Sequence, residues 1–350
     1  MTIRVGLIGY GLSGRVFHAP FITKQVGMRL SHICTSQKDV VLDRWPEMTV
    51  VNDADALLSG DEVDLVVITT PNELHFPQAE LALKSNKHVL LEKPSVTELE
   101  QIETLCRLAN EQGKVFTVYQ NRRFDGDFLR LKRLLDSGEL GELKHLDSRF
   151  DRFRPVAQDR WREQPGVGTG IFWDLGPHVI DQVLALSGTP DWINASVDTL
   201  REGGKAHDRF ELELGYADRR ICLGSTPFEA GEMRRFNARF TQGSWQCFGL
   251  DAQEAALRAG QLPDQADYAE ISQRGLRYVA PNQNEITQHR ESIAAGQYLN
   301  FYQQLTDSIL GQSAPPVSQR HACELVYAML LAMQSADSGQ RHQWQYSCPF

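Results

Sequence analysis

The N-terminal segment constrains the fold of this chain most strongly, because a short apolar strand runs directly into a glycine-rich turn. Residues 3–8 read IRVGLI and lead into Gly9, Gly11 and Gly14, spaced G-x-G-x-x-G, before a helical stretch at about 15–25. In this strand–turn–helix context, the three glycines allow a tight turn, close approach of a pyrophosphate and close packing of the helix. The helix N-terminus presents free N–H groups to phosphates. We therefore predict a dinucleotide site, with a purely structural turn as the alternative; the expected loop contacts are Gly9, Gly11, Leu12, Ser13 and Gly14.

The end of the second strand indicates which dinucleotide is bound. This strand covers about 28–34 and lacks the Asp or Glu that usually binds the ribose hydroxyls of NAD. Thr35, Ser36 and Lys38 follow instead, and their hydroxyls and charge suit a 2′-phosphate. We predict that NADP is preferred, while Asp39 in the same loop keeps NAD open as the alternative.

The pattern of apolar residues changes along the chain and predicts an α/β protein with two domains. Strands and helices alternate up to about residue 120, with strands at 63–68, 88–91 and 115–119 and helices at 76–85 and 97–112. Beyond residue 140, alternation of apolar and polar residues is typical of antiparallel strands, with turns near 217–218 and 242–244 and late helices at 300–310 and 322–335. We predict a Rossmann dinucleotide-binding domain at 1–120 and an α+β domain at 121–350, which would bind substrate and mediate oligomerisation.

Two polar motifs follow predicted parallel strands, whose carboxyl ends face a bound dinucleotide. One is Thr70-Pro71-Asn72, with His75 just beyond it, and the other is Glu92-Lys93-Pro94. Lys93 would point toward the nicotinamide end of the site, where a cation polarises a substrate hydroxyl or accepts its proton. A solvated surface lysine is the alternative, and His75 has the alternative role of supporting the loop.

A third motif, at residues 168–181, contains Asp174, Pro177 and His178. Pro177 suits the first turn of a helix, and the spacing of four places Asp174 and His178 on one helical face. A carboxylate so placed sets the orientation and tautomer of an imidazole that acts as a general base. The alternative is a helix cap at Asp174 and a buried polar histidine. No third ligand accompanies the pair, so we expect no metal.

Composition and charge exclude several other classes of protein. The net charge of −9 argues against nucleic-acid binding, and no apolar run reaches the length of a membrane span. The N-terminal apolar residues belong to the first strand, so no signal peptide is expected. The six cysteines contain no C-x-x-C pair, which favours reduced thiols and a cytoplasmic location.

Taken together, these motifs resemble the family named after glucose–fructose oxidoreductase and inositol dehydrogenase, the Gfo/Idh/MocA family. The resemblance covers essentially the whole chain and rests on the glycine fingerprint, Thr70-Pro71-Asn72 with His75, Glu92-Lys93-Pro94, and Asp174-x-Gly176-x-His178. The segments 119–124 and 150–155 look like the bacterial branch that includes NADP-dependent scyllo-inositol dehydrogenases.

The resemblance implies that Lys93, Asp174 and His178 form the catalytic set. It also implies that the second domain is an open, mostly antiparallel sheet that forms a homodimer or larger oligomer. The expected reaction is reversible hydride transfer between the nicotinamide and a secondary alcohol of a sugar or cyclitol. The candidates for binding such a polyol are Asn121, Arg122, Arg152, Arg154, Arg160 and Trp161. Salt pairing and packing are the alternative roles for each of these residues.

Other functions remain open at this stage. Some relatives of this type are non-catalytic regulators, but they would not need Lys93 and His178. Others hydrolyse glycosides through transient oxidation with tightly bound NAD. A third alternative is a reductase of an aldehyde or keto sugar, in which the same site works in reverse.

Overall fold

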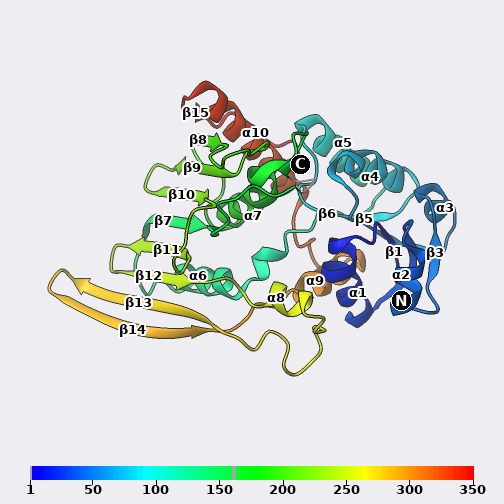
Figure 1. Ribbon diagram of the computed structural model, residues 1–350, viewed down its shortest axis with the longest axis horizontal. Coiled ribbons are helices and arrows are strands. Elements are labelled where there is room, and N and C mark those ends of the chain that lie inside the picture. Colours follow the sequence, from blue (N-terminus) through cyan, green and yellow to red (C-terminus); the bar gives the residue numbers. More distant parts are fainter. Residues whose placement is uncertain (1, 160–162) are drawn as a thin grey trace.

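The chain forms two β-sheets flanked by helices, as shown by a computed structural model that describes residues 2–159 and 163–350 (Figure 1). The first sheet has the order β3-β2-β1-β4-β5-β6, and all its paired strands are parallel. Its strands are β1 (Ile3–Ile8), β2 (Met28–Cys34), β3 (Thr49–Val51), β4 (Leu65–Ile68), β5 (His88–Leu91) and β6 (Phe116–Val118). Central strands such as β4 are buried throughout, because helices cover both faces of the sheet.

Helices connect consecutive strands of this sheet, which is the doubly wound arrangement predicted from the sequence. In α5, Ile102, Leu105, Cys106 and Ala109 are buried, and this i, i+3, i+4, i+7 spacing forms one apolar face against the sheet. The connecting helices are η1 (Gly14–His18), α1 (Ala19–Lys24), α2 (Lys38–Arg44), α3 (Ala54–Leu58), η2 (Asn72–Leu74), α4 (His75–Lys84) and α5 (Leu99–Glu111).

The second sheet has the order β14-β13-β12-β11-β7-β10-β9-β8-β15 and is antiparallel except where β7 pairs with β10. The β13–β14 hairpin projects beyond the rest of the molecule (Figure 1). The strands are β7 (Leu143–Arg149), β8 (Trp192–Asp198), β9 (Arg209–Gly215), β10 (Arg220–Ser225), β11 (Arg234–Phe240), β12 (Gly243–Phe248), β13 (Gln273–Asn282), β14 (Glu285–Ile293) and β15 (His342–Gln343). This mostly antiparallel sheet confirms the predicted fold class.

The remaining helices lie against the second sheet or join the two sheets. They are η3 (Asn121–Phe124), α6 (Gly126–Ser137), α7 (Gly170–Ser187), α8 (Gln253–Arg258), α9 (Leu299–Ile309) and α10 (Gln319–Ser338). The side chains of Phe301, Tyr302 and Leu305 from α9 are fully buried in the hydrophobic core of the first sheet. Late segments of the chain therefore return to the N-terminal core, and the two sheets are held together by packing rather than by a linker.

Two local details differ from the sequence-based expectations. The helix after the glycine fingerprint begins as a π-helical turn, Gly14–His18, before α1 continues it. The prediction that Pro177 lies in the first turn of a helix was wrong, because α7 begins at Gly170 and Pro177 lies inside it. Gly170 has φ +85°, so the glycine lets the chain turn sharply into a helix that starts earlier than the proline suggested.

No helix in the described part of the chain combines the length and apolar character needed to cross a lipid bilayer.

Candidate active site

The glycine fingerprint forms an open backbone cradle at the end of β1. Gly9 has φ +92°, and a Cβ atom added at Gly14 would lie only 2.4 Å from the carbonyl oxygen of Gly9. Gly11 is exposed, and a Cβ there would meet nothing within 4 Å. The loop thus needs glycine at two positions for its own geometry and leaves the third open to a ligand. Leu12 and Ser13 complete the loop, and this cradle fits the pyrophosphate of a dinucleotide.

The loop after β2 carries the residues predicted to select the cofactor. Ser36 and Lys38 are exposed at the start of α2, whereas Thr35 is buried. The hydroxyl of Thr35 accepts a hydrogen bond from the backbone N–H of Gln37 at 3.1 Å, so this side chain shapes the turn. Ser36 and Lys38 are therefore the better-placed candidates for contact with a 2′-phosphate.

The motif Thr70-Pro71-Asn72 follows β4 and is held in place by hydrogen bonds. His75 is 1% exposed, and its ring nitrogens lie 2.9 Å from the carbonyl oxygen of Thr70 and 2.8 Å from that of Pro94. Burial lowers the pKa of His75, which favours the neutral ring despite opposing hydrogen bonds. His75 thus connects the two polar motifs. This contact fits the alternative role for His75, which was to support the loop. Asn72 donates from Nδ2 to the carbonyl oxygen of Gly168 at 2.9 Å, across to the second domain.

Glu92 joins the glycine fingerprint to the end of β5. One oxygen of its carboxylate accepts from the Ser13 hydroxyl and lies 3.0 Å from Nε2 of His18. The other oxygen accepts from the backbone N–H of Lys93 at 2.8 Å. Burial opposes ionisation, but His18, Lys93 and Ser13 outweigh it and lower the pKa of Glu92 to about 2. Glu92 is therefore an ionised clamp between the cofactor loop and Lys93.

Sequence reasoning missed His18, which completes this clamp. Its ring is fully buried, and Nδ1 lies 2.6 Å from the hydroxyl of Tyr302 on α9. A histidine beyond the fingerprint carries no signal by itself, because only the fold brings it to Glu92. The π-helical turn that ends at His18 is the local feature associated with this placement, since such turns often occur at functional sites.

Lys93 and Asp174 meet between the two domains. The Lys93 ammonium donates to the Asp174 carboxylate at 2.9 Å and to its backbone carbonyl at 2.8 Å. Both side chains are largely buried, at 13% and 22% exposure. They line a small pocket completed by Asn72, Pro94, Gly168, Thr169, Gly170 and Trp173.

His178 lies one turn beyond Asp174 on α7 and is 5% exposed. The shared helix confirms the spacing argument for one face, although α7 begins earlier than predicted. The orientation of His178 by Asp174 remains a prediction. The new feature is that the Asp174 carboxylate also contacts Lys93, which brings the strand-end motif and the helix motif into one site.

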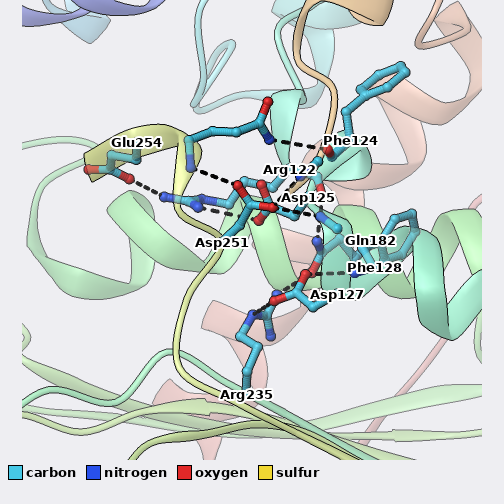
Figure 2. Close-up of polar contacts among 12 residues, drawn as sticks. Arg122, Phe124, Asp125, Asp127, Phe128, Gln182, Arg235, Asp251 and Glu254 are labelled. Atoms are coloured by element: carbon cyan, nitrogen blue, oxygen red, sulfur yellow. Dashed lines mark hydrogen bonds and ion pairs between the residues drawn. The ribbon is translucent and has the colours of Figure 1, made fainter. Parts of the chain in front are cut away.

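Arg122, one of the proposed polyol-binding residues, is engaged within the protein. Arg122 is 7% exposed and forms ion pairs with Asp125 at 3.4 Å and with Glu254 of α8 at 2.5 Å. Figure 2 shows this guanidinium between the two carboxylates, within a buried polar cluster that extends to Asp127 and Arg235. The pairing favours the salt-bridge alternative for Arg122. Asn121 is buried beside it in η3.

The other polyol candidates lie on the segment that follows β7. Arg152 is half-buried and Arg154 is exposed. The backbone N–H of Arg152 donates a hydrogen bond to the carbonyl oxygen of Thr226 at 3.0 Å. The backbone N–H of Arg154 donates to the carbonyl oxygen of Pro227 at 2.8 Å. Arg160 and Trp161 lie outside the described residues.

The comparisons with known proteins agree with this fold. Residues 3–120 match the model of the oxidoreductase family with an NAD-binding Rossmann fold, and residues 128–246 match the GFO/IDH/MocA C-terminal domain. The chain is 39% identical to the uncharacterized oxidoreductase YdgJ of Escherichia coli over 96% of each chain. It is 35% identical to the NADP⁺-linked scyllo-inositol 2-dehydrogenase IolW of Bacillus subtilis, over 96% of this chain and 94% of IolW.

A solved structure extends the likeness to three dimensions. The YPO2259 protein of Yersinia pestis superposes with a TM-score of 0.95 at 36% identity, covering 99% of this chain and 98% of that one. The fold and the site thus define an NAD(P)-dependent dehydrogenase with a Rossmann domain and a second, mostly antiparallel domain. This chain belongs to the Gfo/Idh/MocA oxidoreductase family.

Proposed function

We propose that this protein is an NADP-preferring dehydrogenase that oxidises a secondary alcohol of a cyclitol or sugar, reversibly. The observation that carries the proposal is the contact of Lys93 with Asp174 beside His178, at the carboxyl end of the parallel sheet. Members of this enzyme class place catalytic groups at that end, where the cofactor binds. The 35% identity to IolW supports a cyclitol as the substrate class.

The cofactor would be held by the glycine cradle, by Ser36 and Lys38, and by the motif at Thr70. The absence of an acidic residue from the β2 loop between Cys34 and Lys38 supports NADP, because no carboxylate there repels a 2′-phosphate. The bound nicotinamide supplies the hydride acceptor, or the donor in the reverse direction.

The side chains of this protein supply the proton chemistry and the electrostatics. His178 takes the proton of the substrate hydroxyl at one ring nitrogen, and Asp174 favours the ring orientation that this step needs. The Lys93 ammonium donates a hydrogen bond to the developing alkoxide and stabilises its negative charge. The Asp174 carboxylate positions that ammonium.

Helices α7 and α10 pack against the second sheet, while Glu211 and Glu213 alternate with the buried residues of β9 and mark its outward face. We propose that the outward face joins copies of this chain, which light scattering coupled to size-exclusion chromatography would test. A monomer at micromolar concentration would contradict this part of the proposal.

The proposed reaction is tested by nicotinamide absorbance across inositol isomers, neutral sugars and sugar acids, with NADP and NAD in parallel. Strong reduction of NADP by one or a few members is the expected result. Tight dinucleotide binding without net reduction, in protein that purifies with its cofactor, would contradict the proposal and favour a glycoside hydrolase.

A further inference from the structure

Arg152 differs from the other partly buried arginines near the active site, because its charge has no acidic partner among the described residues. Arg122 pairs with Asp125 and Glu254, and Arg123 pairs with Asp181 at 2.7 Å. For Arg152, no side-chain hydrogen bond or ion pair is found within residues 2–159 and 163–350. Buried charges are normally paired, since removing an ion from water costs several kcal/mol. The isolated guanidinium therefore needs a specific explanation.

The acidic groups around Arg152 are already occupied by other cations. The charges of Asp174 and Glu254 act on its guanidinium, which lies near the catalytic carboxylate and α8. Asp174 pairs with Lys93, however, and Glu254 pairs with Arg122 and with Arg258 at 2.9 Å. The adjacent Asp151 pairs with Arg149 at 2.6 Å.

Arg154 adds a second positive charge on the same side of the segment. Backbone hydrogen bonds to the segment 226–229 hold this part of the chain extended: the N–H of Arg152 donates to the carbonyl oxygen of Thr226, and its carbonyl oxygen accepts from the N–H of Glu229. In an extended segment, residues two apart point to the same face, so Arg152 and Arg154 project together. Burial and the charge of Arg154 lower the pKa of Arg152, and the opposing effect of Asp174 and Glu254 does not outweigh them.

We propose that Arg152, assisted by Arg154, binds an anionic group of the substrate, either a carboxylate or a phosphate ester. The inference rests on the proposed function, because it specifies which polyols that site takes: sugar acids or phosphorylated cyclitols. A guanidinium binds either group through two parallel charge-assisted hydrogen bonds. The excess of positive charge is local, since the whole chain carries −9.

Equilibrium binding to the enzyme with saturating NADPH tests this inference separately from turnover, because the reduced cofactor cannot accept a hydride from the alcohol. Two matched pairs of ligands are titrated by calorimetry: glucuronate against glucose, and myo-inositol 1-phosphate against myo-inositol. The expected result is that an anionic member binds at least about tenfold more tightly than its neutral partner, in a salt-dependent manner. The pair that shows the preference identifies a carboxylate or a phosphate as the ligand.

Variants test whether Arg152 causes the preference for the anionic ligand. Arg152→Gln should abolish the preference for the anion, Arg152→Lys should retain part of it, and the exposed Arg133→Gln should leave it unchanged. Because Arg152 has no described partner, Arg152→Gln should keep or raise the melting temperature and leave the Kd for NADP unchanged.

Three outcomes would overturn the inference. One is equal affinity for charged and neutral ligands in the wild type. Another is a preference that persists in Arg152→Gln, and the third is a loss of NADP binding or of folding in that variant. Reduction of NADP by neutral polyols alone, with equal binding of the matched pairs, would reject the anion subsite and leave the proposed dehydrogenase intact.

Discussion

The Lys93 ammonium lies 2.9 Å from the carboxylate of Asp174, although the two residues are 81 positions apart in the chain. Lys93 comes from the end of β5 in the first domain, and Asp174 comes from α7 in the second. The pair therefore forms only when the two domains are packed together. It gives the proposed alkoxide-stabilising cation a fixed position at the domain interface.

This relationship predicts the behaviour of Asp174→Asn. Loss of the carboxylate removes the charge that positions Lys93 and the group proposed to orient His178, so kcat should fall by about 100-fold or more. The Kd for NADP should change less than twofold, because the glycine cradle is untouched. Steady-state kinetics and quenching of protein fluorescence by NADP measure the two quantities. Near-normal kcat would exclude a catalytic role for Asp174.

The cofactor preference should depend on Ser36. Ser36→Asp places a carboxylate where the 2′-phosphate is expected, so kcat/KM for NADP should fall by at least about tenfold relative to that for NAD. Ser59→Asp, in an exposed loop outside the predicted site, is a suitable control. An unchanged ratio would place the phosphate pocket elsewhere.

Gly14→Ala tests the cradle itself. The new Cβ would lie 2.4 Å from the Gly9 carbonyl oxygen, a backbone atom that cannot move without opening the turn. We expect the Kd for NADP to rise at least tenfold, as measured by fluorescence titration. Gly60→Ala is the matched control, since its nearest neighbouring atom would be 3.9 Å away. Equal binding by both variants would show that the loop tolerates a side chain.

Asp181 should be important for stability rather than for chemistry. It is 1% exposed and pairs with Arg123 at 2.7 Å and with His321 of α10 at 2.9 Å. Removing one partner of a buried ionic cluster typically costs about 3–5 kcal/mol, so Asp181→Ala should lose that order of unfolding free energy. Asp218→Ala, which removes an exposed pair with Arg219, should lower the unfolding free energy far less. Urea denaturation measures the unfolding free energy of both variants. Similar losses in the two variants would contradict the proposed importance of Asp181 for stability.

Acid should destabilise the protein partly through His88. Burial lowers the pKa of His88 from 6.5 to about 4, and its Nδ1 accepts a hydrogen bond from the backbone N–H of Val115. Between these two pH values the unfolded chain binds the proton more readily, so stability rises with pH across this window. Its contribution is complete above about pH 6.5 and is lost as the pH falls to about 4.

The pH dependence of stability is measured by urea denaturation at several pH values. His88→Gln should show a shallower dependence between pH 4 and 6.5 than the wild type, whereas the exposed His289→Gln should follow the wild type. Parallel curves for His88→Gln and the wild type would contradict the assignment.

The sequence predicted the first sheet well, because its central strands are short apolar runs with clear ends. Strands β2 and β5 begin and end at the predicted residues. The start of α7 was wrong, since a proline favours the first turn statistically while burial and Gly170 let this helix begin earlier. Local sequence carries no information on such tertiary compensation.

For the site, the sequence located the motifs but not their partners. The contact of Lys93 with Asp174 and the clamp of His18 on Glu92 join segments that are distant in the chain. The sequence likewise does not show that Arg122 is paired, because only the fold brings Glu254 beside it. Charge type can be read from the sequence, but pairing depends on how the domains pack.

The most direct test compares wild type and Lys93→Ala with the best substrate from the polyol panel, by NADPH formation in a single turnover. We expect Lys93→Ala to lose at least about 1,000-fold in rate, while its Kd for NADPH stays within twofold of the wild type. A variant that retains near-normal turnover would contradict the assignment of Lys93 as the stabilising cation. A parallel loss of NADPH binding would mean that Lys93 holds the cofactor instead.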